Sequence, residues 1–354
     1  MSDSFIPDEV DLQIINALQI RPRASWSQIA GVIGIDPATA ARRWRRLEDA
    51  GAAWIACNPP YESLTAIAHV EIDCVHGRTA DVAQQLARDS ASVSITINAG
   101  GRDLQVMVWT CTSKELARYV LDRLAQIDGI RAVRTFPIVR IYREATGWRL
   151  GALNAEQSRR LRPPSAVMVK PLSRQLTDAE WAVFNALNRD PRIEIKQLAY
   201  ELGVSPSTAR RRLDDLLNNQ SILRTEVARS LSGTPVYATF FGVCPAERLD
   251  STAEALTTLP EIRGVSTHAG KHNVFITAWL RSLEHVQTFE AEIARKLPHL
   301  RIVDRTTVLR TIKLIGRLMD DDGWSIGSVS TDVRQTSMGD VEGLPDRAQL
   351  RPGP

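Results

Sequence analysis

The sequence repeats itself, and this repeat limits the possible fold more than any other feature. The stretch DPATAARRWRRLEDAG, which begins at Asp36, aligns with SPSTARRRLDDLLNN, which begins at Ser205, at a spacing of 169 positions. Further along the chain the spacing becomes 170 positions, which aligns Trp109 with Trp279. A unit of about 145 residues therefore occurs twice, and both copies are expected to fold in the same way.

Length and charge narrow the class of protein. The chain has 354 residues, which predicts two to four domains at roughly 100–200 residues per domain. Its net charge is only +3, so affinity for nucleic acid requires local clustering of basic residues. The four cysteines show no C-x-x-C spacing, which favours reduced thiols. With no apolar leader and no run long enough to span a bilayer, we expect a cytoplasmic, nucleoid-associated protein without membrane contact.

Three helices are predicted at the start of each copy. In the first copy they cover residues 8–19, 26–33 and 37–49, with Gly34 suited to the left-handed turn after the second helix. Asp36 is a good N-cap, and the proline after it suits the first helical position. Two helices joined by a tight glycine turn form a helix-turn-helix. This motif is predicted in two domains, residues 1–58 and 175–228.

The third helix has a core face and an outer face. Ala40, Trp44 and Leu47 recur at helical spacing and are predicted to face the core. Arginines on a helix commonly just face water, but this helix is the one that enters the DNA major groove in such motifs. Arginine bonds guanine O6 and N7 in a fork and neutralises phosphate. The predicted DNA contacts are Ala38, Thr39, Arg42, Arg43, Arg46, Ser207, Thr208, Arg211 and Arg212.

The two copies differ on this outer face. Positions 42–46 hold four arginines, whereas the aligned positions 211–215 hold two arginines and two aspartates. We therefore expect the first copy to contribute more phosphate affinity and the second to read its half-site weakly.

The remainder of each copy alternates strands and helices in the order βαββαβ, predicted over residues 62–144 and 234–319. In the third strand Leu104, Val106 and Val108 lie on one face, and Met107 and Trp109 on the other. Since helices cover only one face of such a sheet, the other is expected to pack against a second sheet. The candidate is the twin domain of the same chain or of a neighbouring chain.

Two segments lie outside the repeat. Residues 145–174 include RRLRPPSAVMVKPLSR, which predicts a semi-extended linker. Residues 324–354 are polar and rich in glycine, which predicts a disordered tail.

A helix-turn-helix of this pattern followed by a βαββαβ domain resembles the Lrp/AsnC (leucine-responsive regulatory protein) family of transcriptional regulators. The resemblance implies an α+β fold with two tandem units, each a winged-helix-like helix-turn-helix domain followed by a ferredoxin-like domain. It also implies sequence-specific binding of double-stranded DNA, an amino acid or related small molecule as effector, and homo-oligomers formed through the βαββαβ sheets. No cofactor and no metal are expected.

The same resemblance places an effector site at the glycine-containing turn before the third strand. Its residues are Gly100, Gly101, Arg102 and Asp103 in the first copy, and Gly270, Lys271, His272 and Asn273 in the second. Asn273 replaces the family's aspartate, which would alter charge pairing with an α-amino group, so the second pocket binds something else or nothing. The alternative is that both are tight turns that need glycine for backbone reasons alone.

Two rival functions are consistent with this domain order. Siroheme decarboxylases resemble the same two-domain family, but a longer histidine- and tyrosine-rich segment is expected before their third strand, and only KHN hints at it here. A nucleoid-organising protein that binds DNA without an effector is the other. His268 and His272 lack the glutamate and helix of a zinc protease, and for His69 a surface or interface role is favoured over catalysis. No catalytic residue is therefore predicted.

Overall fold

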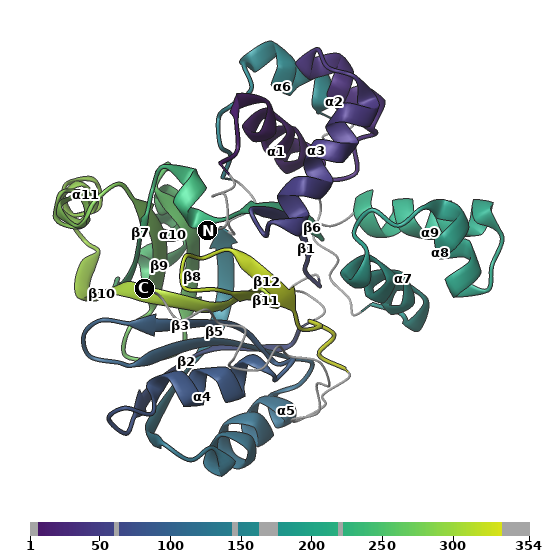
Figure 1. Ribbon diagram of the computed structural model, residues 1–354. Coiled ribbons are helices and arrows are strands. Elements are labelled where there is room, and N and C mark those ends of the chain that lie inside the picture. The colour runs from purple at the N-terminus through teal and green to yellow at the C-terminus, as the bar shows by residue number, and fades with distance from the viewer. Residues whose placement is uncertain (1–5, 60–63, 144–147, 163–175, 219–221, 335–354) are drawn as a thin grey trace. The chain divides into compact units, whose positions relative to one another are not determined.

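The computed structural model describes residues 6–59, 64–143, 148–162, 176–218 and 222–334. The chain divides into two compact units, and each unit combines the corresponding parts of both copies (Figure 1). One, here called the helical unit, comprises residues 1–64 and 144–233, and the other, the sheet unit, residues 65–143 and 234–354. The repeat of the sequence is therefore not the unit of the fold. The helical domains of the two copies form one unit, and their βαββαβ domains form the other.

The helical unit contains two three-helix domains. Side-chain caps begin the helices of the first: Asp8 and Ser25 each form a capping box, and Asp36 accepts from two backbone N–H groups of the helix that Pro37 opens. Gly34 ends the second helix in the left-handed region, with a φ of 87°. The helices are α1 (Glu9–Ile20), α2 (Trp26–Ile33), α3 (Pro37–Asp49), α7 (Asp178–Arg189), α8 (Ile195–Leu202) and α9 (Pro206–Asn218).

A two-stranded antiparallel sheet joins the two helical domains. It consists of β1 (Ala53–Cys57) and β6 (Leu223–Val227), which follow α3 and α9 at equivalent places. The register is reciprocal, since Trp54 pairs with Glu226, the equivalent of Ala56, and Ala56 pairs with Arg224, the equivalent of Trp54. The Thr225 hydroxyl also donates to the Leu18 carbonyl oxygen of α1 at 2.9 Å. The two helical domains are thus related by a local twofold rotation.

Two arginines repeat this symmetry in the loops before α2 and α8. Arg23 donates to the carbonyl oxygens of Pro191 and Ile193 at 2.6 and 2.7 Å. Arg192 donates to the equivalent carbonyl oxygens of the first copy, at Pro22 and Ala24, at 2.6 and 2.8 Å. Burial lowers the pKa of both guanidinium groups, to about 10 for Arg192. Each copy therefore supplies two carbonyl oxygens that bind a half-buried cation of the other.

The sheet unit contains two βαββαβ domains, which confirms the predicted fold class. The second helix of the first domain is irregular, because α5 (Ser113–Arg118) continues into a π-helical turn (Tyr119–Arg123) and a 3₁₀ turn (Leu124–Gln126). The remaining elements are β2 (Ala66–Cys74), α4 (Thr79–Ala87), β3 (Ser92–Asn98), β4 (Leu104–Thr110), β5 (Ile130–Arg143), β7 (Val236–Val243), α10 (Leu249–Leu256), β8 (Ile262–His268), β9 (Val274–Leu280), α11 (Leu283–Lys296) and β10 (Arg301–Leu314).

The last strand of each domain is long and pairs with both copies. β5 pairs with β2 of its own domain and then with β8, and β10 pairs with β7 and then with β3. The cross-copy registers are equivalent, since Arg143 opposes Val265 in one and Lys313 opposes Ile95 in the other. The strands close into a ring, in the order β10-β3-β4-β2-β5-β8-β9-β7, with β7 paired back to β10. The second sheet expected from the apolar third strand is therefore the twin domain of the same chain.

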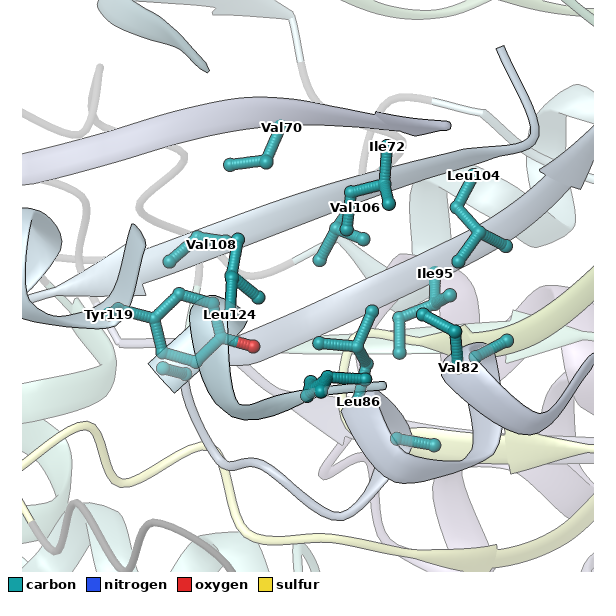
Figure 2. Packing of buried hydrophobic residues seen from close by; sticks show 14 of the residues in the cluster. Val70, Ile72, Val82, Leu86, Ile95, Leu104, Val106, Val108, Tyr119 and Leu124 are labelled. Atoms are coloured by element: carbon teal, nitrogen blue, oxygen red, sulfur yellow. The ribbon is translucent and has the colours of Figure 1, made fainter. Parts of the chain in front are cut away.

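The first domain's core lies between its sheet and its helices. Val106 and Val108 of β4 point toward Leu86 of α4 and Tyr119 of the π-helical turn (Figure 2). Leu318, at the end of the second copy, and Val329, in the segment that follows it, belong to the same cluster. The second copy thus completes the core of the first domain.

Two segments expected to lack structure contain elements. The predicted linker includes α6 (Ala155–Leu161), whose Gln157 and Arg160 donate to carbonyl oxygens at the end of α2 at 3.2 and 3.0 Å. The start of the predicted disordered tail forms β12 (Ser325–Ser328), which pairs with β11 (Arg317–Met319). Both predictions were wrong there, because residues distant in sequence order these segments. Residues 145–147 and 163–174 of the linker and 335–354 of the tail lie outside the described residues.

Candidate nucleic-acid interface and effector loops

Helix α3 presents two exposed arginines on the face opposite its buried one. Ala40, Trp44 and Leu47 are buried as predicted. Arg42 and Arg45 are exposed on the other side, and within the described part of the chain neither forms an ion pair. Arg42 was predicted, but Arg45 was missed, although its spacing of three residues from Arg42 places it on the same helix face. This pair supplies α3 with exposed positive charge that forms no ion pair among the described residues.

The start of α3 is fixed by its N-cap. The backbone N–H groups of Ala38 and Thr39 donate to the Asp36 carboxylate at 2.8 and 3.3 Å. Ala38 is exposed and Thr39 is half-buried. Ala38 therefore lies on the same exposed face of α3 as Arg42, four residues later, and Arg45, seven residues later.

The other two arginines of α3 predicted as DNA contacts, Arg43 and Arg46, bind carboxylates of α1 and of its N-cap Asp8. Arg43 Nη1 lies 2.8 Å from Asp8 Oδ2 and 2.9 Å from Asp11 Oδ1, and Arg46 Nη2 lies 2.7 Å from Asp11 Oδ2. The Asp11 side chain is fully buried. The bonds to Asp8 and then Asp11 raise the pKa of Arg43. These arginines therefore brace α3 against α1 in this structure instead of facing outward unpaired.

The second recognition helix, α9, carries a different set of charges. Ser205 caps it, with its hydroxyl accepting from the Thr208 N–H at 3.2 Å. Ser207 is exposed and Thr208 half-buried. Arg211 is exposed but lies 3.7 Å from Asp215 one turn away, and Arg212 is half-buried. Less unpaired positive charge is therefore exposed on α9 than on α3.

The first predicted effector loop is tied down by a buried arginine. Arg102 Nε lies 2.8 Å from Glu71 Oε1, its Nη2 bonds to Asp304, and its guanidinium covers the Phe241 ring at 4.2 Å. Asp304 and Phe241 belong to the second copy. The side chain of Arg102 is only 6% exposed, and its charge is paired with Glu71 of its own copy and with Asp304 of the other. Gly100 and Gly101 directly precede Arg102 in the turn, and Gly101 is exposed.

Asp103 and Asn273 have the same local role in the two loops. The Asp103 carboxylate accepts from the Cys74 N–H at 2.7 Å, and the Asn273 side-chain oxygen accepts from the Cys244 N–H at 2.9 Å. Asn273 also donates to the Cys244 carbonyl oxygen at 2.7 Å. Because this bond needs only an acceptor, asparagine replaces aspartate here without loss of the turn.

The second loop lies against aromatic rings. The His272 ring contacts Phe136 and Phe241 edge-on, with centroids 6.3 and 5.8 Å apart. A Cβ added to Gly270 would lie 3.1 Å from the Phe136 ring, so glycine allows this close approach. Lys271 is exposed.

Both loops rest on the last strand of the other copy. The Ala99 N–H donates to the Thr307 carbonyl oxygen and the Ala269 N–H to the Pro137 carbonyl oxygen, each at 2.9 Å. A molecule bound at either loop would therefore contact the pairing between copies directly.

A histidine pair joins β2 of the first domain and β8 of the second. His69 Nδ1 and His268 Nε2 are 3.0 Å apart, and both side chains are buried. Phe275 covers His69 with ring centroids 4.2 Å apart. Burial, and then His268, lowers the pKa of His69 well below its ordinary value, and burial, then His272, lowers the pKa of His268 to about 4. His69 therefore has the interface position that its sequence context favoured.

The comparisons with known proteins match both halves of this architecture. The AsnC-type helix-turn-helix domain matches residues 8–48 and 181–217, and the Lrp/AsnC ligand binding domain matches residues 243–318. An uncharacterized HTH-type transcriptional regulator of Pyrococcus abyssi is 32% identical over 133 residues, which cover 36% of this chain and 83% of the relative. The chain belongs to the Lrp/AsnC family. The HTH-type transcriptional regulator FL11 of Pyrococcus furiosus is 26% identical over 144 residues, covering 40% of this chain and 95% of FL11.

Membership of the Lrp/AsnC family assigns the general function. A helix-turn-helix of this family joined to its ligand-binding domain is the combination of a DNA-binding transcriptional regulator that responds to a small-molecule effector. Among solved structures, the siroheme decarboxylase NirDL has a TM-score of 0.57 at 13% identity, covering 90% of this chain and 95% of that one. At this identity the likeness concerns the fold alone.

Two requirements are not met within the described residues of this Lrp/AsnC protein, that of a membrane-spanning helix and that of a metal site made of three or more ligating side chains. None of the described helices is long and apolar enough to cross a membrane. Within the same residues, no three or more histidine, cysteine, aspartate or glutamate side chains are placed to hold a metal ion.

Proposed function

We propose that a single chain binds double-stranded DNA with both recognition helices, α3 and α9. The observation that carries this proposal is the exposure of Arg42 and Arg45 on α3, on the face opposite its core and without an ion pair among the described residues. An uncompensated guanidinium pair on this helix fits guanine edges and backbone phosphates in a major groove. The predicted contacts Ala38, Ser207 and Arg211 lie on the same or the equivalent face.

The reciprocal joining of the two helical domains supports binding to paired half-sites. The β1–β6 pairing and the matching bonds of Arg23 and Arg192 hold α3 and α9 in a twofold arrangement within one chain. Two half-sites spaced about one helical turn, roughly 34 Å, suit such an arrangement. A protein with this role works in the cytoplasm, at the nucleoid.

We propose that an amino acid or related metabolite acts as the effector at the loops that contain Arg102 and His272. The support is that each loop bonds to the last strand of the other copy. An effector that prefers one arrangement of this contact shifts the DNA-binding equilibrium by its differential affinity for the two states. The charged first loop and the aromatic second loop offer different chemistry, so we expect one effector class for each at most.

We propose that the chain is a regulator and not an enzyme. The named relatives are transcriptional regulators, and the likeness to a siroheme decarboxylase is one of fold. The rival is tested by incubating the protein with siroheme under reducing, oxygen-free conditions. Loss of carboxyl groups from the tetrapyrrole, detected by mass spectrometry, would favour the enzyme.

We also propose that whole chains associate through the sheet unit. Val139 and Leu309 occupy equivalent positions on β5 and β10 and are 68% and 66% exposed. Two large apolar side chains related by the local symmetry suit an interface with a second copy. Light scattering of the wild type and of V139D/L309D tests this, and equal masses for both proteins would argue against it.

The test of DNA binding begins with in vitro selection of bound duplexes, followed by affinity measurements across salt concentrations. R42A/R45A should lose at least about tenfold in affinity, because each good arginine–guanine fork contributes about 1–3 kcal/mol. If the arginines bind phosphates instead, the slope of log affinity against log salt should fall by about 0.9 for each phosphate that the variant no longer neutralises.

The matched control is R88A/R118A, which removes two exposed arginines of the sheet unit. This control should bind the selected duplex as the wild type does. If wild-type protein retains no duplex in a salt-sensitive manner, or if R42A/R45A changes neither affinity nor salt slope, the proposal is wrong.

A further inference from the structure

The outer ridges of α3 and α9 carry opposite charges at one equivalent position. On α3 the ridge runs Ala38, Arg42 and Arg45, at spacings of four and three residues. The aligned residues of α9, 169 positions later, are Ser207, Arg211 and Asp214. Arg45 and Asp214 are both exposed. A guanidinium on one helix is thus replaced by a carboxylate on the other, at the same place on the recognition surface.

The neighbouring side chains increase this difference. Arg45 forms no ion pair within the described part of the chain, and the same is true of Arg42. On α9 the exposed Arg211 lies 3.7 Å from Asp215, which occupies the place of Arg46. Arg210, in the place of Ala41, adds one positive charge at the side of the ridge. The carboxylate of Asp214 is therefore exposed on α9 at the place where the guanidinium of Arg45 is exposed on α3.

The scaffold presents these unlike ridges in equivalent geometry. Ile55 pairs with Thr225, and Arg23 and Arg192 make the same two carbonyl bonds in opposite directions. A duplex with a perfect palindrome would offer the same bases and phosphates to both helices. Because the helices differ in charge at one matched position, they cannot recognise the same base there equally well.

We infer that the chain reads an asymmetric operator in one fixed orientation, with Arg45 and Asp214 as the residues that set the difference. This inference rests on the proposal that the helical unit binds duplex DNA. Arginine donates to guanine O6 and N7, whereas a carboxylate accepts from the cytosine N4 amino group. The position read by Arg45 in one half-site is guanine, and the symmetry-related position read by Asp214 in the other half-site is cytosine.

The experiment compares the sequence preferences of charge variants with that of the wild type. Wild-type protein should select a consensus that differs between half-sites at one matched position. D214R should favour guanine at both matched positions and bind that symmetric duplex at least about tenfold more tightly than the wild type does. The exchange R45D/D214R should keep the wild-type consensus with its orientation reversed on the duplex, as read by directional cleavage from a probe tethered to one helix.

Two controls separate base recognition from added charge and from loss of fold. E156R makes the same charge change at an exposed residue of α6 in the same unit, so it should raise affinity for all duplexes without changing base preference. Thermal unfolding of each variant should match that of the wild type. If D214R unfolds, R45D tests the same point from α3, since it should replace guanine by cytosine in the first half-site.

The outcomes distinguish this inference from the proposal beneath it. No salt-sensitive binding of any duplex by the wild type would refute DNA binding itself. Tight binding with a palindromic wild-type consensus would leave DNA binding intact and overturn the asymmetric reading. A D214R consensus that does not differ from that of E156R would also overturn the asymmetric reading.

Discussion

Lys313 and Arg143 occupy equivalent positions in the two copies, and each binds carbonyl oxygens at or just after the C-terminal end of the first helix of the other copy's domain. Lys313 Nζ lies 3.0 Å from the Ala87 carbonyl oxygen and 2.8 Å from that of Asp89. Arg143 Nη1 makes the matching bond to the Leu259 carbonyl oxygen at 3.0 Å. A cation at the C-terminal end of a helix is favourable. Each last strand therefore holds the other domain through one basic side chain.

Only one of these two cations titrates near neutral pH. Lys313 is fully buried, and burial lowers its pKa from 10.5 to about 7. The unfolded chain binds more protons than the folded chain between these values, so this group makes stability rise with pH from about 7 to about 10. The rise should be on the order of a few kcal/mol relative to K313M, in which nothing titrates at this site.

The measurement is the free energy of unfolding in urea at several pH values. The free energy of unfolding of the wild type minus that of K313M should rise from pH 7 to pH 10. The same difference between the wild type and R143M should stay constant, because arginine remains charged. A K313M difference that does not change over this range would show that Lys313 does not titrate there.

The buried histidine pair predicts a loss of stability on the acid side. His69 and His268 have pKa values held below the ordinary 6.5, that of His268 at about 4. As pH falls from 6.5 toward 4, the unfolded chain takes up protons that the folded chain resists, so stability falls. H69N/H268N should lose less stability over this interval than the wild type, measured by urea unfolding. H76N, at an exposed histidine, should behave as the wild type; equal slopes for all three proteins would contradict the prediction.

Arg42 and Arg43 are adjacent in sequence but are expected to respond differently to substitution. R43A removes the partner of Asp8 and part of the compensation of the buried Asp11, which should cost about 1–3 kcal/mol of stability. R42A should change stability by less than about 0.5 kcal/mol, because Arg42 is exposed and forms no ion pair in the described part of the chain. Thermal unfolding checks both. If the two variants unfold at the same temperature, the bridge to α1 contributes nothing.

The sequence predicted local faces well and distant partners poorly. Helical spacing placed Ala40, Trp44 and Leu47 in the core, because burial of a helix face depends on local periodicity. The same pattern placed Arg43 among the outward residues, since the carboxylates that bind it come from another helix. Spacing alone indicates a face but does not show whether a neighbouring element already occupies it.

The missed helix in the linker had a local signal, whereas the joining of like domains had none. Asn154 and Gln157 form a capping box at the start of α6, and the letters NAEQ at this point fit that pattern. By contrast, the pairing of Arg143 with Val265 and of Lys313 with Ile95 depends on strands of both copies meeting in three dimensions. The repeat predicts two equal folds but does not predict that the last strand of each also pairs with the other.

Arg23 and Arg192 provide the last prediction. It distinguishes the contribution of the contact between the two helix-turn-helix domains from the affinity of each domain for its own half-site. R23M/R192M removes four bonds to backbone carbonyl oxygens between the domains. A fixed second domain binds at high effective concentration once the first is bound, and loosening the join lowers that concentration. Affinity for a duplex with both half-sites should therefore fall at least about tenfold, while affinity for a single half-site stays unchanged. R189M, at an exposed arginine of α7, should alter neither. Equal losses on both duplexes would mean that these arginines support each domain's own fold and not their alignment.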